Sequence, residues 1–329
     1  MLPDQIKALE IKNEALSLET IDCPKPNDQE VLIKVHASGV NRADILQRKG
    51  LYPAPEGIPD IPGLEIAGEV VISRSGKWSP GDKVCALLSG GGYASYVTAP
   101  AQHCLAVPAH LSFEQAAAMP ETFLTIWHNL FYRHEIQPGQ SILIHAGASG
   151  IGTAAIQILK LMDVEVFTTA GSDEKCHSCV KLGAKAAINY KKQDFVPRIL
   201  ELTNHKGVNF VLDMIGGNYF KKNLDCLCVE GTHISIAFLN GAKADIVIPE
   251  IMQKRLTLTG STLRARSPEI KSQLVESMEK TIWPLVEKGE ISPLIDSIFP
   301  YYVATDAHKK MERREHSGKI VLTWEGEKH

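Results

Sequence analysis

The chain has 329 residues, a length that suits two hydrophobic cores better than one. Its hydrophobic fraction of 44% and charged fraction of 22% are typical of a globular enzyme, and a net charge of −3 argues against binding to nucleic acid or an anionic membrane. No N-terminal signal peptide is recognisable, and no apolar run approaches the ~18 residues of a membrane span. The seven cysteines are scattered and odd in number, which predicts reduced thiols and a cytoplasmic location.

The first ~120 residues are predicted to be rich in β-strands, because short apolar runs alternate there with Gly and Pro. Examples of these runs are residues 31–37, 68–72 and 96–98. Residues 113–130 then carry apolar groups at helical spacing, and Pro138-Gly139 ends that pattern.

Strands and helices are predicted to alternate in the next part of the chain. Apolar runs at 142–145, 164–169, 186–190, 208–213, 234–237 and 256–259 fit six short strands. The clearest intervening helix places Ile151, Ala154, Ala155, Ile158, Leu159 and Met162 on one stripe. Such alternation predicts an α/β fold with a parallel, doubly wound sheet.

The residues after Ser261 are predicted to form a long amphipathic helix over 270–286 and a final strand over 319–323. They are too few for a third domain, so we expect them to rejoin the first one. The predicted domains are therefore 1–122, completed by 265–329, and 123–264.

A glycine loop connects the first strand and helix of the alternating region. It reads Gly147-Ala148-Ser149-Gly150-Ile151-Gly152, with the spacing G-x-x-G-x-G rather than G-x-G-x-x-G. As a bare pattern this is weak, and a turn that only packs the helix on the sheet is the alternative. Its position between a strand and an apolar helix favours a dinucleotide site, with the pyrophosphate at the helix N-terminus.

The end of the second strand predicts which dinucleotide is bound. It reads Ala170-Gly171-Ser172, with no carboxylate at the tip for a ribose 2′-hydroxyl. Ser172 and Lys175 instead suit the 2′-phosphate of NADPH. The alternative is that Asp173 or Glu174 reaches the ribose, but we expect both in the first turn of the next helix.

Two cysteine pairs raise the question of a metal or redox site. Cys176 and Cys179 are one helical turn apart, and Cys226 and Cys228 lie further on. Zinc needs four convergent ligands and no second C-x-x-C is present, so simple packing is the favoured interpretation and a redox dithiol the alternative. His145, beside the glycine loop, is predicted to be a hydrogen-bonded structural histidine rather than a base.

Several motifs, in order along nearly the whole chain, resemble the medium-chain dehydrogenase/reductases. They are Asn41-Arg-Ala-Asp44, Pro62-Gly-Leu-Glu-Ile-Ala-Gly-Glu-Val, Gly90-Gly-Gly-Tyr-Ala-Ser-Tyr-Val, His145-Ala-Gly-Ala-Ser-Gly-Ile-Gly, Asn189-Tyr-Lys-Lys, Asp213-Met-Ile-Gly-Gly and Gly318-Lys-Ile-Val-Leu. The likeness is greatest to the zinc-free, zeta-crystallin-like quinone oxidoreductases. Zinc-dependent relatives have a cysteine where this chain has Asn41 and a histidine where it has Leu64. The resemblance therefore implies that no zinc is bound.

By this resemblance, a GroES-like β-barrel catalytic domain accompanies a Rossmann domain, with the active cleft between them. Tyr190, Lys175, Ser172 and Gly171 would hold the adenosine phosphate. The remaining cofactor contacts would come from Ile215 and, towards the nicotinamide, from Thr125, Phe238, Leu239 and Leu263. Asn41 and Tyr52 would face the nicotinamide and substrate. Lys319 matches a basic cofactor-contacting position, although a surface charge at a strand start is the alternative.

The predicted reaction is hydride transfer from NADPH to a quinone or similarly activated enone. Asn41 and Tyr52 would donate hydrogen bonds to the developing oxyanion, and water would supply the final proton. Two alternatives stay open: reduction of alkenal or enone double bonds, and an NADPH-binding structural or sensor protein with little turnover. The last strand of the sheet would leave an open edge, which predicts a homodimer with a continuous sheet.

Overall fold

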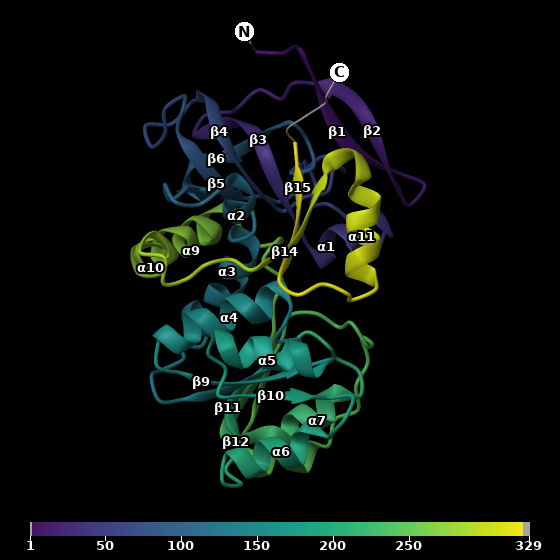
Figure 1. The fold of residues 1–329 in the computed structure, drawn as a ribbon, viewed down its shortest axis with the longest axis vertical. Coiled ribbons are helices and arrows are strands. Elements are labelled where there is room, and N and C mark those ends of the chain that lie inside the picture. Colours follow the sequence, from purple (N-terminus) through teal and green to yellow (C-terminus); the bar gives the residue numbers. More distant parts are fainter. Residues whose placement is uncertain (1, 325–329) are drawn as a thin grey trace. The chain divides into compact units, whose positions relative to one another are not determined.

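A computed structural model describes residues 2–324 of the chain. The chain divides into two compact units, Met1–Thr125 with Leu263–His329 and Ile126–Thr262. The domain boundaries expected at residues 122 and 264 lie three and two residues from these joins at 125 and 262. Each unit is described by itself (Figure 1).

The first unit is built on a seven-stranded sheet, as the β-rich N-terminal sequence predicts. The strand order is β14-β15-β3-β4-β5-β7, and β6 also pairs with β3. The strands β1 and β2 form a separate antiparallel hairpin. The strands are β1 (Gln5–Lys12), β2 (Ala15–Asp22), β3 (Glu30–Val40), β4 (Glu65–Ser73), β5 (Lys83–Leu87), β6 (Tyr96–Pro100), β7 (Cys104–Ala106), β14 (Ile295–Pro300) and β15 (Lys319–Thr323).

The C-terminal segment is part of the first unit because β15 pairs antiparallel with β3 and parallel with β14. Apolar side chains of β3 and β4, such as Val31, Ile33 and Ile66, are fully buried in one core of this unit. The helices of the unit are α1 (Arg42–Arg48), η1 (Ala101–His103), α2 (Phe113–Ala116), α3 (Pro120–Ile126), α9 (Pro268–Thr281), α10 (Trp283–Glu287), η3 (Tyr301–Val303) and α11 (Ala304–Glu312).

The second unit is the doubly wound sheet expected from the alternating sequence. Its six strands follow the order β10-β9-β8-β11-β12-β13, and every pair of neighbours is parallel. Helices α4 and α5 lie on one face, and α6 and α7 lie on the other (Figure 1). The elements are η2 (Trp127–Tyr132), β8 (Ser141–Ile144), α4 (Gly150–Leu161), β9 (Glu165–Ala170), α5 (Asp173–Leu182), β10 (Ala186–Asn189), α6 (Phe195–Leu202), β11 (Val208–Asp213), α7 (Tyr219–Cys226), β12 (Leu227–Ser235), α8 (Ile248–Lys254) and β13 (Thr257–Gly260).

Local sequence explains why α4 begins and packs as it does. Ser149 caps the helix, accepting a hydrogen bond from the Gly152 amide. Four residues of the predicted stripe, Ala154, Ala155, Ile158 and Leu159, are buried. The strands they cover are apolar on both faces, which is typical of a parallel sheet between two helical layers.

Two predicted helices are broken in the structure. Residues 113–130 form α2, α3 and a π-helical turn, and Pro120 is the first residue of α3. Residues 270–286 form α9 and α10, separated at Ile282. Pro284 near the start of α10 has no amide hydrogen to continue the preceding helix.

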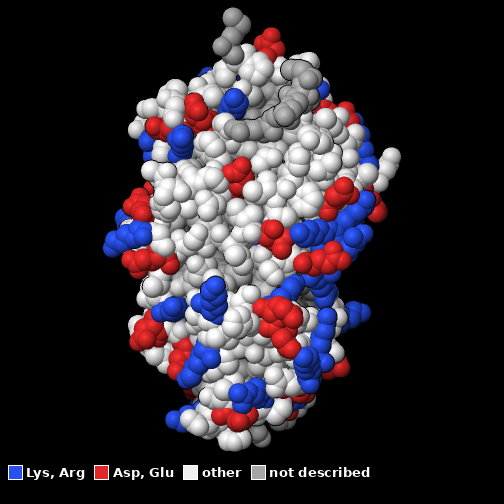
Figure 2. All heavy atoms as spheres, viewed as in Figure 1, with Lys and Arg blue, Asp and Glu red and all other residues white. Residues whose placement is uncertain are grey.

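Charged side chains are mixed over the face that Figure 2 shows, with no continuous basic stripe. Within residues 2–324, no helix has both the length and the apolar character needed to cross a bilayer.

Candidate cofactor and active site

The predicted cofactor residues of the second unit lie at one edge of its sheet. Each group directly follows the carboxyl end of a strand: 147–152 after β8, 171–175 after β9, Tyr190 after β10, Ile215 after β11, and Phe238 with Leu239 after β12. The chain winds from β8 through β9 to β10 on one side, then from β11 to β13 on the other. Ligands of such sheets bind where the winding reverses, which here is at the ends of β8 and β11.

The glycine loop has no room for side chains at two positions. A Cβ added to Gly147 would overlap the Thr168 side chain. A Cβ added to Gly152 would lie 2.5 Å from the Gly147 carbonyl oxygen and 2.6 Å from that of Ala146. The loop therefore packs tightly against the start of α4, whose first amides, at Gly150 and Ile151, lack partners within the helix. This cradle fits the pyrophosphate of a dinucleotide.

The tip of β9 combines hydroxyl groups with lysines. Ser172 caps α5 by accepting a hydrogen bond from the Lys175 amide at 3.3 Å. The Tyr190 hydroxyl reaches to 2.9 Å from where a Gly171 Cβ would be, and Lys191 lies beside it. These residues fit a phosphate group at this corner of the sheet.

The two carboxylates that could compete for this corner lie in the first turn of α5, as expected. Asp173 accepts a hydrogen bond from Asn189 at 2.7 Å and pairs with Lys192. These partners lower the pKa of Asp173, led by the Asn189 hydrogen bond. Asp173 is therefore engaged by the β10 loop.

A buried polar network holds the end of β11. His145 bonds to the Thr169 hydroxyl at 2.9 Å and to the Asn223 side-chain oxygen at 2.7 Å, so its predicted structural role is confirmed. Burial lowers its pKa. Asp213 contacts His233 at 3.2 Å and accepts the Ile215 amide at 2.7 Å. The network fixes the backbone around Ile215.

The segment after β12 packs on the segment after β11. The Leu239 amide donates to the Met214 carbonyl at 3.1 Å. A Cβ on Gly216 would come within 3.2 Å of Phe238, whose own side chain is 57% exposed. Phe238 is thus held by its backbone, with its ring available to a ligand.

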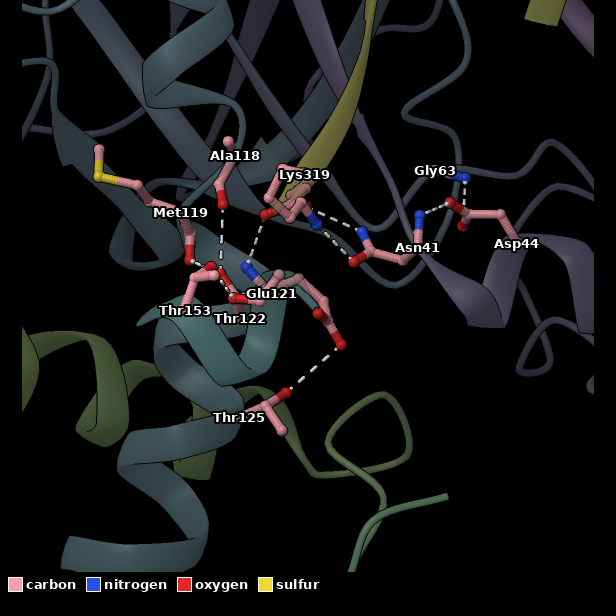
Figure 3. Close-up of polar contacts among 12 residues, drawn as sticks. Asn41, Asp44, Gly63, Ala118, Met119, Glu121, Thr122, Thr125, Thr153 and Lys319 are labelled. Carbon is pink, nitrogen blue, oxygen red and sulfur yellow. Dashed lines mark hydrogen bonds and ion pairs between the residues drawn. The ribbon is translucent and has the colours of Figure 1, made fainter. Parts of the chain in front are cut away.

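In the first unit, Asn41 and Lys319 belong to one buried cluster (Figure 3). The Lys319 ammonium donates to the Asn41 side-chain oxygen at 2.7 Å and to Glu65 Oε1 at 2.5 Å. Asn41 Nδ2 donates to the same Glu65 oxygen at 2.9 Å. Lys319 is only 4% exposed, so the alternative that it is a surface charge is wrong.

Glu121 extends this cluster to Thr125. Its backbone amide donates to Glu65 Oε2 at 2.8 Å, and its carboxylate accepts the Thr125 hydroxyl at 3.3 Å (Figure 3). Burial raises the pKa of Glu121 to about 7. Three predicted site residues, Asn41, Thr125 and Lys319, are therefore joined through two carboxylates.

Asp44 fixes the other side of Asn41. It accepts the Asn41 amide at 2.7 Å, the Gly63 amide at 3.2 Å and the Tyr93 hydroxyl at 3.1 Å. Burial raises the pKa of this carboxyl to about 6, although its hydrogen bonds oppose the shift.

Tyr52 is contacted by Arg264, the residue that follows Leu263 in the chain. The Arg264 guanidinium lies 5.4 Å from the centre of the Tyr52 ring and donates to the Tyr52 carbonyl at 3.3 Å. It also donates to Gln47 and to the Ser89 carbonyl. Tyr52 is therefore held by Arg264, whereas Asn41 is held by Glu65 and Lys319.

Sequence reasoning missed three charged residues that make these contacts, namely Glu65, Glu121 and Arg264. One sequence signal was available for Glu65, because it stands between the apolar Leu64 and Ile66. It is the first residue of β4 and is 0% exposed. A carboxylate there must have a partner, and Lys319 is the partner.

The cysteine pairs do not form a metal site in the part of the chain that the structure describes. No three His, Cys, Asp or Glu side chains among residues 2–324 are placed to hold a metal ion. All seven cysteines have free thiols, and burial raises the pKa of Cys179 to about 12. A thiol that resists ionisation is a poor redox nucleophile, which favours the packing interpretation.

Two family models match the chain. Residues 27–109 match the alcohol dehydrogenase GroES-like domain, and residues 150–280 match the zinc-binding dehydrogenase model.

Individual relatives match over nearly their whole length. A quinone oxidoreductase of Pseudomonas aeruginosa is 32% identical over 316 residues, which are 94% of this chain and 95% of the relative. The solved Escherichia coli quinone oxidoreductase in complex with NADPH has a TM-score of 0.85 and 30% identity, covering 97% of this chain and 99% of its own. The CurK enoyl reductase superposes with a TM-score of 0.84 at 29% identity, covering 98% and 99%.

Proposed function

The chain belongs to the medium-chain dehydrogenase/reductase superfamily, and from this premise we propose that it transfers hydride from NADPH to quinones or similarly activated enones without zinc. Membership makes it an oxidoreductase of that superfamily. The solved relative in complex with NADPH supports the choice of cofactor, as do Ser172, Lys175 and Tyr190.

The fit of the cofactor rests on the cradle at Gly147 and Gly152, which any side chain would fill. NADPH, when bound, supplies the hydride. The chain supplies backbone amides at the start of α4 for the pyrophosphate, and lysines near Ser172 for the 2′-phosphate.

The observation that carries the acceptor proposal is the donor set of the first unit. Asn41 and Leu64 stand where the resemblance places zinc ligands, and neither side chain can bind zinc as Cys or His does. An acceptor oxygen must then be polarised by hydrogen bonds. A quinone needs no more than this, because hydride addition leads to an aromatic product.

We assign these hydrogen bonds to the Tyr52 hydroxyl and to the Asn41 amide. Asn41 Nδ2 has two hydrogens, and its contact with Glu65 uses one of them. Its other contacts hold the amide in a fixed orientation, so donating to an acceptor would require little reorganisation.

Steady-state oxidation of NADPH tests the proposal. Turnover with 1,2-naphthoquinone by protein treated with a chelator and lacking stoichiometric zinc is the expected result. Zinc-dependent activity would contradict the zinc-free mechanism.

Reduction of an enone carbon–carbon double bond is the second candidate, favoured by the likeness to an enoyl reductase. Turnover with trans-2-hexenal but not with naphthoquinone would favour this double-bond reductase activity. NADPH binding without turnover of either would instead indicate a structural or sensor protein.

The Tyr52 hydroxyl can be tested separately. Tyr52→Phe should lower kcat/KM for the quinone, and the loss should correspond to about 1–2 kcal/mol of transition-state stabilisation. This is less than the ~3 kcal/mol of a full oxyanion donor, because a quinone spreads its charge. The dissociation constant of NADPH should not change. Tyr302→Phe, which removes the hydroxyl of an exposed tyrosine, is the control. Full quinone turnover by the Tyr52 variant would show that this residue shapes the pocket and does not donate the proposed hydrogen bond.

A further inference from the structure

Glu121 has a carboxyl group to which the proposed hydride transfer assigns no role. It is the second residue of α3, and its side chain is only partly buried. Its carboxylate accepts the hydroxyl of Thr125, one helical turn further along. The resemblance to the superfamily implies that Thr125 lies near the nicotinamide.

The groups around Glu121 favour its protonated form near neutral pH. Burial is the largest cause that raises its pKa to about 7. Glu65 of β4 and Asp44 of α1 raise it further, whereas Lys319 of β15 and the Thr125 hydrogen bond lower it. A carboxyl group with a pKa in this range can both release and regain a proton during turnover.

Glu121 is one of the residues that line a small cavity. Its volume is about 10 Å³, close to the smallest that holds one water molecule. The walls are formed by four leucines and three charged residues: Leu64, Leu87, Leu88, Leu263, Glu121, Arg264 and Lys271.

The two cations of the cavity have neutral hydrogen-bond partners. Lys271 donates to the Ser89 hydroxyl at 2.7 Å and to the Arg264 carbonyl at 2.8 Å. Arg264 donates to the Ser89 carbonyl at 2.7 Å and to the Gln47 side-chain oxygen at 2.9 Å. Burial and the nearby Arg264 lower the pKa of Lys271 to about 8. A water molecule here would have charged groups to bind, including the Glu121 carboxyl.

We infer that Glu121 stores the proton for the reduction, passes it through the Thr125 hydroxyl to the reduced acceptor, and regains it from water in the cavity. The inference rests on the proposed function and replaces direct protonation by bulk water. It makes Glu121 a positioning and relay residue, since Thr125, and not Glu121, would touch the acceptor.

The transfer balances. The acceptor takes a hydride, that is two electrons and one proton, from NADPH. The anionic oxygen that results takes the Thr125 hydroxyl proton, and Thr125 takes the proton of Glu121. Glu121 is left as a carboxylate and recovers a proton from water, so the sum is acceptor plus NADPH plus H⁺ giving reduced acceptor plus NADP⁺.

A purely structural role for Glu121 makes a different prediction. In that case Glu121 only orients Thr125, and Gln, which can accept the same hydrogen bond, would replace it without altering the pH dependence. The pH profile therefore separates the two roles.

The experiment compares wild type, Glu121→Gln and Thr125→Val, with Glu114→Gln as the matched control. Glu114 lies in α2 and is also partly exposed. Wild-type kcat with naphthoquinone should fall as pH rises through about 7, where Glu121 loses its proton. Both relay variants should lose that dependence, and at low pH their kcat should be about 10- to 100-fold lower, below the full range for general acids because water can substitute. Glu114→Gln should match wild type.

A wild-type pH profile in either relay variant would overturn the inference, and so would wild-type kcat. These results leave the proposed function intact, because that depends on turnover by the wild type. A readout without turnover is the infrared band of a protonated carboxyl group in the protein with NADP⁺. The spectrum of wild type minus that of Glu121→Gln should contain such a band, which should disappear as the pH rises through about 7. Asp44, whose pKa is raised to about 6, contributes to both proteins and cancels in the difference. A difference spectrum without this band would also overturn the inference.

Discussion

Lys175 shows how a residue at a helix start can select a cofactor. Its amide is fixed by Ser172, so its side chain leaves α5 close to the tip of β9. Lys175→Ala should weaken NADPH binding by about 1–3 kcal/mol, the scale of a lost charge-assisted hydrogen bond, and NADH binding little. Fluorescence titration with both cofactors measures this, and Lys185→Ala, whose lysine pairs with Glu165, is the control. Equal losses for both cofactors would rule out contact with the phosphate.

His308 is a histidine whose protonated, charged form is disfavoured in the folded protein. It is fully buried, and its Nε2 lies 3.1 Å from the Tyr93 hydroxyl. Burial, followed by the nearby Arg48 charge, lowers its pKa from 6.5 to about 3. As pH falls below 6.5 the unfolded chain therefore binds a proton that the folded chain refuses, and stability is lost down to about pH 3.

His308→Gln should remove this loss while keeping a donor or acceptor near Tyr93. Between pH 6.5 and pH 5, its free energy of unfolding should fall by about 2 kcal/mol less than that of wild type, since each pKa unit is worth ~1.4 kcal/mol. Asp44, whose raised pKa of about 6 acts in the opposite direction, is common to both proteins. Urea denaturation measures the difference, and the exposed His110→Gln is the control. Parallel pH curves for wild type and His308→Gln would contradict the assignment.

At the scale of elements, the contact between the glycine loop and α4 is the most sensitive to change. Gly152→Ala would press its Cβ against the carbonyl groups of Gly147 and Ala146 and push the helix start away from the loop. The dissociation constant of NADPH should rise at least about tenfold, or ~1.4 kcal/mol. Gly76→Ala adds a Cβ in open space and should have no effect. An unchanged dissociation constant for Gly152→Ala would contradict the proposal that the glycine loop holds the pyrophosphate.

Elements with a strong period could be predicted, and weakly patterned ones could not. The strand predicted over 319–323 has its observed bounds, and five of the six strands predicted in the alternating region lie within one residue of the observed ones, because parallel strands are continuously apolar. The prediction at 234–237 is wrong for most of β12, which begins at Leu227. The prediction missed α11 and β14. Of the nine residues of α11, four are charged, and its apolar stripe consists only of Ala304, Ala307 and Met311, which is too weak to predict a helix.

The site was predicted unevenly for a related reason. Residues that follow strand ends, such as Gly147 and Ser172, can be located from the alternation of elements alone. Glu65, Glu121 and Lys319 come from three separated segments, and only tertiary packing brings them together. Local patterns contain no information about such long-range pairs.

For the molecule as a whole, the open edge of the second unit's sheet is its most consequential surface. The edge strand β13 pairs on one side with β12, as predicted for the last strand. Just before it, Ile246, Val247, Ile248 and Met252 are 52%, 42%, 64% and 70% exposed. So many large apolar side chains within one short segment suggest a surface covered by another protein.

We expect a second copy of the chain to cover this surface, since a two-fold axis would pair the two β13 edges and bury both apolar segments. Wild type should be a dimer by light scattering at micromolar concentration. The double variant Ile248→Asp with Met252→Asp should be a monomer, because dimerisation would bury two unpaired carboxylates from each subunit. Leu18→Asp, at an exposed leucine of β2, should remain dimeric. A monomeric wild type would refute the expectation, and a dimeric double variant would place the interface elsewhere.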